Sequence, residues 1–171
     1  MKKVALLWLL GLALFAGELY FMPYESREAT KKLYHWIDTA HSTIDISMFM
    51  FTNKAIAKRI KNAAKRGVKV RIILDRESTK ERYSQLPYLA KYRNIDLYLI
   101  KGKKIRHRER HGHMHIKIAI IDRRRLIFGS ANWTNSAFRY NYELIYFLDD
   151  IPAAKKATKY FERILRDAEP Y

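Results

Sequence analysis

Four polar side chains stand out in a stretch of eighteen residues that is otherwise rich in isoleucine. His115 and Lys117 are two positions apart, so in a strand both side chains point to one face. Ser130 and Asn132 follow a second apolar run, and a turn over residues 122–125 would fold this run back beside the first. An imidazole, an ammonium, a hydroxyl and an amide would then meet at one place. This set suits a phosphodiester, because lysine supplies charge, the hydroxyl and amide supply oriented donors, and the imidazole attacks or transfers a proton.

The spacing of these residues also follows a defined pattern. After His-x-Lys come four residues and Asp122, then six residues and Gly-Ser-x-Asn, which ends at Asn132. This block resembles the HKD motif of the phospholipase D superfamily and matches it without a gap. The competing interpretation is an ordinary hairpin with one surface histidine and one surface lysine. We disfavour it because a lysine pointing inward from an apolar strand is rarely buried without a partner.

The segments before this block predict alternating helices and strands. Apolar residues at helical spacing predict a helix within residues 25–41, and alternation with β-forming residues predicts a strand over 43–51. Asn53 is expected to cap a second helix that ends at Gly67, and residues 68–74 form a strongly apolar strand. Strand, helix and strand in this order favour parallel pairing in an α/β sheet.

The remaining segments complete the expected fold. Residues 76–94 predict a loop and a short helix, strands are expected at 95–100 and 142–148, and residues 133–135 are expected to be a loop. We therefore expect an α/β fold with a mixed, largely parallel central sheet and helices on both faces, an α-β-α sandwich as in the phospholipase D superfamily. A final helix begins at Pro152, and its predicted buried face consists of Tyr160, Phe161, Ile164 and Leu165.

Composition bounds the class of protein. A chain of 171 residues with 49% apolar residues is long enough for a single domain with a real core, which we place at residues 20–171. Lysine and arginine number 34 against 17 aspartates and glutamates, a net charge of +17. This excess favours nucleic acid or an anionic lipid surface over a basic surface kept only for solubility. No cysteine is present, which excludes disulfides, thiolate nucleophiles and cysteine-ligated zinc.

Residues 1–17 predict an export signal or a membrane anchor. Two lysines precede an apolar run of thirteen residues, from Val4 to Ala16, which is short for a membrane-spanning helix. Ala16 and Gly17 offer a cleavage point, although Leu14 matches poorly the small residue expected before it. A retained anchor and a buried helix of the domain are the alternatives. Either export interpretation predicts a periplasmic, membrane-associated or secreted domain.

Residues 101–113 form a basic loop that leads directly into the His115 strand. Cations beside a reactive centre hold phosphates, so this loop is a candidate nucleic-acid contact. The alternatives are a solvated loop without a role in binding and a zinc site built from histidines. The candidate phosphate-binding residues are Lys103, Lys104, Arg106, Arg108 and Arg110, and the candidate zinc ligands are His107, His111, His113 and His115.

The resemblance extends over residues 20–168, which are similar to the short bacterial Nuc-type endonucleases of this superfamily, among them exported, membrane-associated members. Members carry two HKD motifs per active site, and this chain carries one. The resemblance therefore implies a homodimer in which each subunit gives one histidine and one lysine to a shared site on a two-fold axis. It also implies that no metal or other cofactor takes part.

Residue roles follow from the same resemblance. His115 of one subunit attacks phosphorus and forms a phosphohistidine, while His115 of the partner subunit protonates the leaving oxygen and then activates water. Lys117, Ser130 and Asn132 hold the non-bridging oxygens. Glu143 fixes the imidazole, unless it is only a surface strand residue. Asp122 belongs to the motif, but beside an arginine-rich turn we interpret it as structural.

Three functions remain open at this point. The first is a metal-independent endonuclease with little sequence specificity, acting on DNA or RNA, with single strands a plausible substrate. The second is a phospholipid phosphodiesterase of the cardiolipin type, and the third is a non-catalytic nucleic-acid binder. The net charge of +17 favours nucleic acid over lipid, and the intact motif argues against a pure binder.

Overall fold

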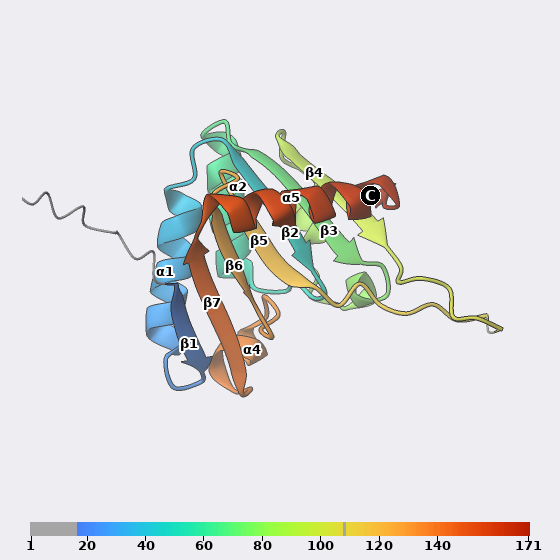
Figure 1. Ribbon diagram of the computed structural model, residues 1–171, viewed down its shortest axis with the longest axis horizontal. Coiled ribbons are helices and arrows are strands. Elements are labelled where there is room, and N and C mark those ends of the chain that lie inside the picture. The colour runs from blue at the N-terminus through green and yellow to red at the C-terminus, as the bar shows by residue number, and fades with distance from the viewer. Residues whose placement is uncertain (1–16, 108) are drawn as a thin grey trace, which may run out of the picture.

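The computed structural model describes residues 17–107 and 109–171 as an eight-stranded sheet with helices on both faces (Figure 1). The strand order is β1-β7-β6-β5-β2-β3-β4-β8. In chain order the strands are β1 (Glu18–Met22), β2 (Thr43–Met48), β3 (Lys69–Asp75), β4 (Ile95–Ile100), β5 (Lys117–Ile121), β6 (Arg125–Gly129), β7 (Glu143–Asp149) and β8 (Glu169–Pro170).

Pairing in the sheet is mixed, as the sequence predicts, but it is not largely parallel. Parallel pairing is limited to β2 with β3 and β3 with β4. The neighbours β1–β7, β7–β6, β6–β5, β5–β2 and β4–β8 are all antiparallel. The expected predominance of parallel strands was therefore wrong. The physical reason is that β5, β6 and β7 follow one another through connections without a crossover helix long enough to reverse the chain, so they pair as antiparallel hairpins.

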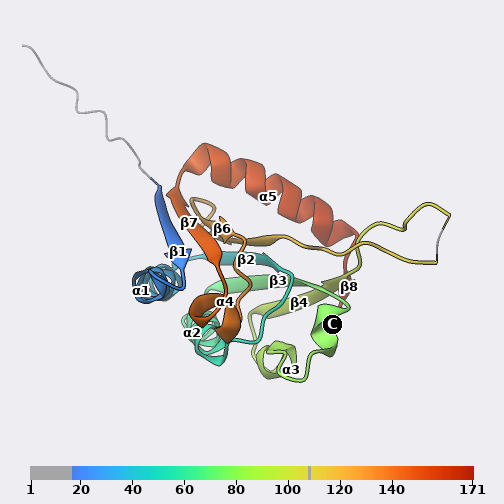
Figure 2. The same cartoon turned by 90° about the horizontal axis from the view of Figure 1, so that it is seen from below.

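Helices cover the two faces unequally (Figure 2). The long helix α5 (Ile151–Arg166) crosses one face, whereas four helices lie on the other. These are α1 (Ser26–Asp38), α2 (Lys54–Lys65), the short α3 (Leu86–Leu89) and α4 (Asn135–Arg139), with a 3₁₀ turn, η1 (Ser78–Lys80), before α3. Helices on both faces are thus confirmed.

Local signals determine where α2 begins and ends. The Asn53 side chain accepts hydrogen bonds from the backbone N–H of Ala55 and Ile56 at 3.0 and 3.1 Å, which satisfies donors that the helix itself leaves open. Gly67 follows the helix with a φ of 98°, a left-handed conformation that glycine adopts without steric cost. Both predictions for this helix are confirmed. The cap and the turn at Gly67 set the direction in which β3 begins.

Two apolar clusters hold the layers together. The larger one packs α1 and α2 on the sheet, with Leu33 and Ile60 fully buried. The smaller one lies under α5, where Phe161 contacts the face that carries Ile73 and Ile120. Tyr160, predicted to be buried, is 56% exposed, because it lies about 100° around the helix from Phe161.

An ion-pair network anchors α5 to the sheet. Arg71 of β3 forms two hydrogen bonds with the buried carboxylate of Asp45 on β2, at 2.7 and 2.8 Å, and a third with Glu162 of α5 at 2.7 Å. The hydrogen bond with Asp45 is the main reason that the pKa of Arg71 is raised. The guanidinium also lies 4.9 Å from the Phe161 ring. Polar and apolar contacts therefore fix the same helix in one place.

Three short elements were not predicted from the sequence. β1 extends the folded region to Glu18, two residues before the predicted domain start. α4 begins at Asn135, the last residue of the loop expected at 133–135, and Thr134 caps it through Ala137 N at 3.1 Å. β8 adds a two-residue edge to β4.

The predicted export signal or anchor covers residues 1–17, of which residues 1–16 lie outside the described residues and Gly17 directly precedes β1. Within residues 17–107 and 109–171, no helix has both the length and the apolar character needed to cross a membrane.

Candidate active site

Four motif residues gather where the central strands β2, β5, β6 and β7 end, at one end of the sheet along the strand direction. Lys117 at the start of β5 pairs with Met48 at the end of β2, and Ile118 pairs with Phe128 near the end of β6. Glu143 lies at the start of β7, the strand that pairs with β6. Antiparallel pairing brings these strand ends together, so segments far apart in the sequence meet at the same end of the sheet.

The His115–Lys117 pair forms the centre of the site. Lys117 Nζ lies 3.0 Å from His115 Nδ1 and donates to the His115 carbonyl at 2.7 Å. Lys117 is 8% exposed, whereas His115 is exposed. Burial lowers the pKa of Lys117, and the nearby Glu143 carboxylate partly opposes this shift. A buried cation next to an accessible imidazole is suited to an anionic group that arrives from solvent.

Phe49, in the segment after β2, orders this pair. Its ring centroid lies 4.6 Å from the His115 ring, and Lys117 Nζ lies 5.2 Å from the same centroid. It also meets His113 edge-on at 5.6 Å. Sequence reasoning missed Phe49, because it lies in a distant segment, directly after β2, and has no fixed spacing to the motif. Its role is to restrict the rotamers of the polar pair through packing.

Ser130 and Glu143 form a second polar group at this edge. The Ser130 hydroxyl donates to the Glu143 carboxylate and accepts from Leu144 N at 3.1 Å. The Asn141 amide lies at 3.5 Å from the other Glu143 oxygen. Within the described part of one chain, the hydrogen bonds of Glu143 go to these neighbours and not to His115. The predicted role of Glu143 in fixing the imidazole stays a prediction.

Asn132 is held through its side-chain carbonyl. Its Oδ1 accepts from Met50 N at 3.2 Å, which leaves both hydrogens of the amide nitrogen available for a substrate oxygen. The adjacent Trp133 bridges to Phe51, and Thr52 N donates to the Trp133 carbonyl at 3.0 Å. These bonds fix the segment after β6 against the segment after β2.

Gly129 allows β6 and β7 to approach at the point where Ser130 begins. A Cβ at this position would lie 2.2 Å from the Leu144 carbonyl oxygen, which is backbone and cannot rotate away. Ser130 N donates to the same oxygen at 3.1 Å. The glycine of the Gly-Ser-x-Asn sequence is therefore required by close contact between two strands.

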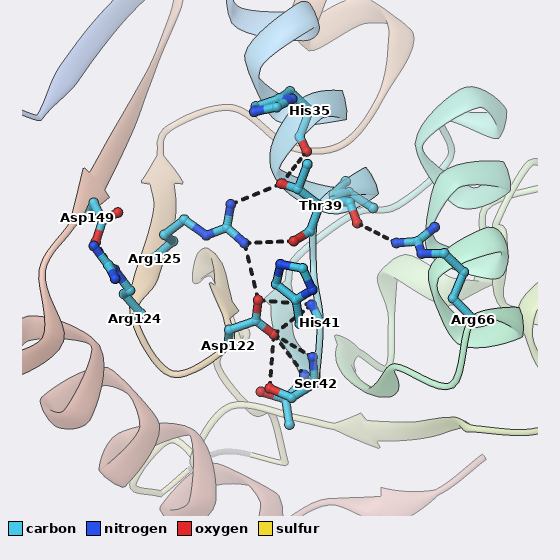
Figure 3. A network of polar contacts seen from close by, with 11 residues as sticks. His35, Thr39, His41, Ser42, Arg66, Asp122, Arg124, Arg125 and Asp149 are labelled. Carbon is cyan, nitrogen blue, oxygen red and sulfur yellow. Dashed lines mark hydrogen bonds and ion pairs between the residues drawn. The ribbon is translucent and has the colours of Figure 1, made fainter.

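Asp122 lies in the β5–β6 turn, at the opposite strand ends from the other motif residues. Figure 3 shows its polar contacts. Its carboxylate accepts backbone N–H groups from His41 at 3.0 Å, Ser42 at 2.8 Å and Thr43 at 3.1 Å, and it receives Arg125 Nη2 at 3.2 Å. Burial alone would raise the pKa of Asp122, but these hydrogen bonds outweigh it and the pKa is lowered. Asp122 therefore ties the hairpin to the connection between α1 and β2.

The basic loop forms an arm that projects from the body, consisting of residues 101–107 and 109–114 (Figures 1 and 2). Its two sides are joined by Gly102 N to Gly112 O at 2.9 Å and by a bridge between Lys104 and His111. Lys103 lies near the base, while Lys104 pairs with Glu109 at 3.6 Å farther out. Arg106 and Arg110 are exposed on the outer part of the arm, and Arg108 lies outside the described residues.

Asp75 anchors the base of the arm. This buried carboxylate, at the end of β3, accepts Met114 N at 2.9 Å and lies 3.4 Å from His113 Nδ1. An aspartate that closes a buried apolar strand is a signal that sequence reasoning could have used. In the described part of the chain, no three His, Asp or Glu side chains lie together as potential metal ligands.

Comparisons with known proteins agree with this geometry. Residues 33–165 match the sequence profile of a family described as "Cardiolipin synthase, PLD-like domain". NucT from Helicobacter pylori has a similar structure, with a TM-score of 0.88 and 38% identity, covering 91% of this chain and 99% of that one. Nuc from Salmonella typhimurium, a phospholipase D family member, shares the fold with a TM-score of 0.78 and 24% identity over 91% of this chain and 97% of that one.

A curated relative of known activity is more distant. Mitochondrial cardiolipin hydrolase of Mus musculus is 30% identical over 145 residues, which are 85% of this chain and 62% of the mouse protein. The chain thus spans less than two thirds of that relative's length. The fold, together with the His-x-Lys pair at the start of β5, defines a phospholipase D-like domain. The chain belongs to the phospholipase D superfamily, which confirms the resemblance that its HKD block carries.

Proposed function

We propose that this protein is a phosphodiesterase that cleaves nucleic acid, DNA or RNA, with little sequence preference and without a metal ion. The observation that carries this proposal is the contact between Lys117 Nζ and His115 Nδ1 at 3.0 Å, with a basic arm beside it. The pair supplies a nucleophile and a cation for a phosphodiester, and the arm supplies cations for neighbouring phosphates. The similarity to NucT, at 38% identity, supports a nuclease.

In the proposed reaction, His115 forms a bond from its ring nitrogen to phosphorus. The bond from phosphorus to the leaving oxygen breaks, and that oxygen takes a proton from His115 of the partner subunit. Water then attacks the phosphohistidine and gives its proton to the same partner imidazole, which releases the phosphate monoester and restores both histidines. Lys117 and the Asn132 amide stabilise the negative charge on the non-bridging oxygens.

The second imidazole requires a second copy of the chain, because each chain carries one motif. The proposed contact surface is the apolar rim beside Ser130 and Glu143, where Phe21 and Leu144 are 51% and 37% exposed. A shallow hollow of about 440 Å³ lies in this rim. Continuity with the site residues favours a two-fold dimer that closes over the motif.

Dimer formation is tested by the mass in solution and by activity together. Wild-type protein is expected to sediment at twice the chain mass of 20.4 kDa. Leu144→Asp is expected to yield monomers that have lost turnover, since a shared site cannot form. Ile151→Asp is the control, because Ile151 is also exposed but lies at the start of α5. An active wild-type monomer would reject the shared site.

A phospholipid substrate of the cardiolipin type is the second candidate, supported by relatives named mitochondrial cardiolipin hydrolase. The two functions are separated by one panel containing single-stranded oligonucleotide, duplex plasmid and cardiolipin vesicles, each with EDTA. We expect cleavage of nucleic acid that survives the chelator. Hydrolysis confined to the vesicles would replace the first function by the second, and loss of activity with EDTA would contradict the metal-free reaction.

The role of His115 is tested directly by His115→Ala. Turnover is expected to disappear while oligonucleotide binding stays within about twofold, because the nucleophile is lost and the cations remain. His35→Ala, an exposed histidine on α1, is the matched control. Turnover retained by His115→Ala would contradict the assignment.

Phosphate binding by the arm is a further part of the proposal. Replacing Lys103, Lys104, Arg106, Arg108 and Arg110 together by glutamine is expected to weaken oligonucleotide binding and flatten its salt dependence. An unchanged slope would mean that the arm does not touch phosphates.

Export is proposed from the N-terminal residues. We propose that residues 1–17 direct the domain out of the cytoplasm, where it is periplasmic, membrane-associated or secreted. Cell fractionation with N-terminal sequencing of the mature protein tests this: a chain starting near residue 18 indicates cleavage, and a full-length chain in the membrane fraction indicates an anchor. Full-length chain in the cytoplasm would contradict export.

A further inference from the structure

A groove of about 1000 Å³ begins at His115 and runs between the base of the arm and the second half of α5. One wall carries His113 and Met114, and the other carries Tyr160 and Arg163 of α5. Because His113 and His115 both contact the Phe49 ring, the wall is continuous with the reactive imidazole. A substrate that leaves the reactive centre on this side must pass through the groove.

Cations dominate the lining of this groove. Lys101, Lys103 and Arg163 are exposed, and within residues 17–107 and 109–171 none of them forms an ion pair. Glu169, one of the two acids in the lining, is already bound by Arg76. Asp167 at the end of α5 is the remaining acid, so the positive charges outnumber the free negative charge. An anionic segment is therefore favoured here.

The wall next to the reactive centre is rigid. Asp75 is fully buried and accepts Met114 N at 2.9 Å and Ser78 N at 3.2 Å, besides its contact with His113. These bonds fix the backbone on one side of the groove relative to β3. A rigid wall means that the two sides keep their separation when a ligand enters, which lowers the entropy cost of binding.

Tyr160 and Arg163 present two different groups on one face of α5. They are three positions apart, which places them on neighbouring turns of the same helix face. The Tyr160 side chain is 56% exposed, although an aromatic residue on this amphipathic helix could have packed on the sheet as Phe161 does. An exposed aromatic ring beside an unpaired guanidinium matches what a nucleotide offers, a base to stack and a phosphate to bind.

We propose that this groove is a nucleotide subsite for the residue next to the scissile bond. Arg163 and Lys101 bind the oxygens of the neighbouring phosphate, and Tyr160 stacks on the base. The inference rests on the proposed nuclease function and adds to it a binding site on α5, outside the HKD block. It implies that a substrate with one phosphate and no neighbouring nucleotide gains nothing from these residues.

The experiment compares two substrates that differ in this respect. Bis(4-nitrophenyl) phosphate has a single phosphate and reaches only the reactive centre, whereas a short single-stranded oligonucleotide also extends along the groove. Kinetic constants are measured on full-length protein for Arg163→Gln, and for Arg166→Gln as the matched control. Arg166 belongs to the same last turn of α5 but does not line the groove.

For Arg163→Gln we expect KM on the oligonucleotide to rise about fivefold and the salt slope of binding to fall by about 0.7, the value for one phosphate contact on a single strand. Tyr160→Ala should raise the same KM by roughly tenfold and Tyr160→Phe should restore it, since either aromatic ring can stack. Hydrolysis of the aryl diester and kcat should stay unchanged in all of these variants.

Several results would overturn the subsite. One is an oligonucleotide KM for Arg163→Gln equal to that of Arg166→Gln, and another is an equal loss on both substrates. Failure of the proposed function has a different signature: wild-type protein would hydrolyse the aryl diester or cardiolipin vesicles and leave the oligonucleotide intact. Binding of a fluorescent oligonucleotide to His115→Ala, alone and combined with Arg163→Gln, then shows whether the groove still binds nucleotides.

Discussion

Replacing Asp122 separates structural from chemical roles within the HKD block. Its carboxylate accepts three backbone N–H groups, from His41, Ser42 and Thr43, and also the Ser42 hydroxyl at 3.0 Å and Arg125 (Figure 3). The side chain is 17% exposed, so water can reach part of this network. Hydrogen bonds to a charged group contribute about 1.5–3 kcal/mol each, and partial replacement by water places the loss for Asp122→Ala at roughly 3 kcal/mol.

Backbone conformation adds to the loss in the alanine variant. Asp122 has a φ of 53°, in the left-handed region, where alanine costs about 1 kcal/mol more than aspartate or asparagine. Asparagine tolerates the left-handed φ as aspartate does and keeps one accepting oxygen. Asp122→Asn therefore tests the loss of the negative charge with little backbone cost. We expect it to lose about 1–2 kcal/mol, measured as the free energy of unfolding in urea.

The sign of the pH dependence follows from the lowered pKa of Asp122. Its stabilising contribution is present above the ordinary aspartate pKa of about 3.9 and disappears as the pH falls from there through the folded-state value. The wild type should therefore lose its advantage over Asp122→Asn in acid, and the difference in unfolding free energy should shrink below about pH 4.

Measurements of activity decide whether Asp122 has a structural or a chemical role. At a temperature where both proteins are folded, Asp122→Asn is expected to keep kcat within about twofold of wild type, because the carboxylate lies at the opposite end of the sheet from His115. Wild-type stability in Asp122→Asn, or a large fall in kcat without a loss of stability, would refute the structural interpretation.

Three further perturbations test the geometry of the site and its support. Gly129→Ala places a Cβ 2.2 Å from the Leu144 carbonyl oxygen, so we expect a loss of about 2 kcal/mol in thermal denaturation together with a lower kcat; a stable, fully active variant would show that β6 and β7 need not approach there. Burial lowers the pKa of Lys117, so kcat/KM should fall on the alkaline side at a pH below the ordinary lysine pKa of about 10.4. Lys117→Arg should move this alkaline fall to higher pH. Superimposable pH–rate profiles of the two proteins would contradict a role for the Lys117 ammonium. Asp45→Ala leaves the Arg71 guanidinium with Glu162 alone and should cost about 3 kcal/mol in urea unfolding, whereas a change below about 0.5 kcal/mol would show that Asp45 does not anchor the layer under α5.

The sequence by itself determined the features that depend on neighbours along the chain. The turn that begins at Asp122 and the return run to Ser130 fold as expected, whereas the strand begins at Lys117 and His115 lies two residues before it, with its imidazole still 3.0 Å from Lys117 Nζ. The N-cap of α2 at Asn53 was likewise readable, since capping involves residues two and three positions away. Local periodicity and capping act over a few residues, and a single sequence carries that information.

Tertiary structure alone decided which distant segments complete the site. Three residues with no fixed spacing to the motif surround the site: Phe49 from the segment after β2, Asp75 from the end of β3 and Arg163 from α5. The mostly antiparallel pairing and the edge position of β1 were also beyond local patterns, because a strand's partner is chosen by burial over the whole sheet. Sequence spacing therefore identified the candidate groups for the chemistry, and long-range packing determined what surrounds them.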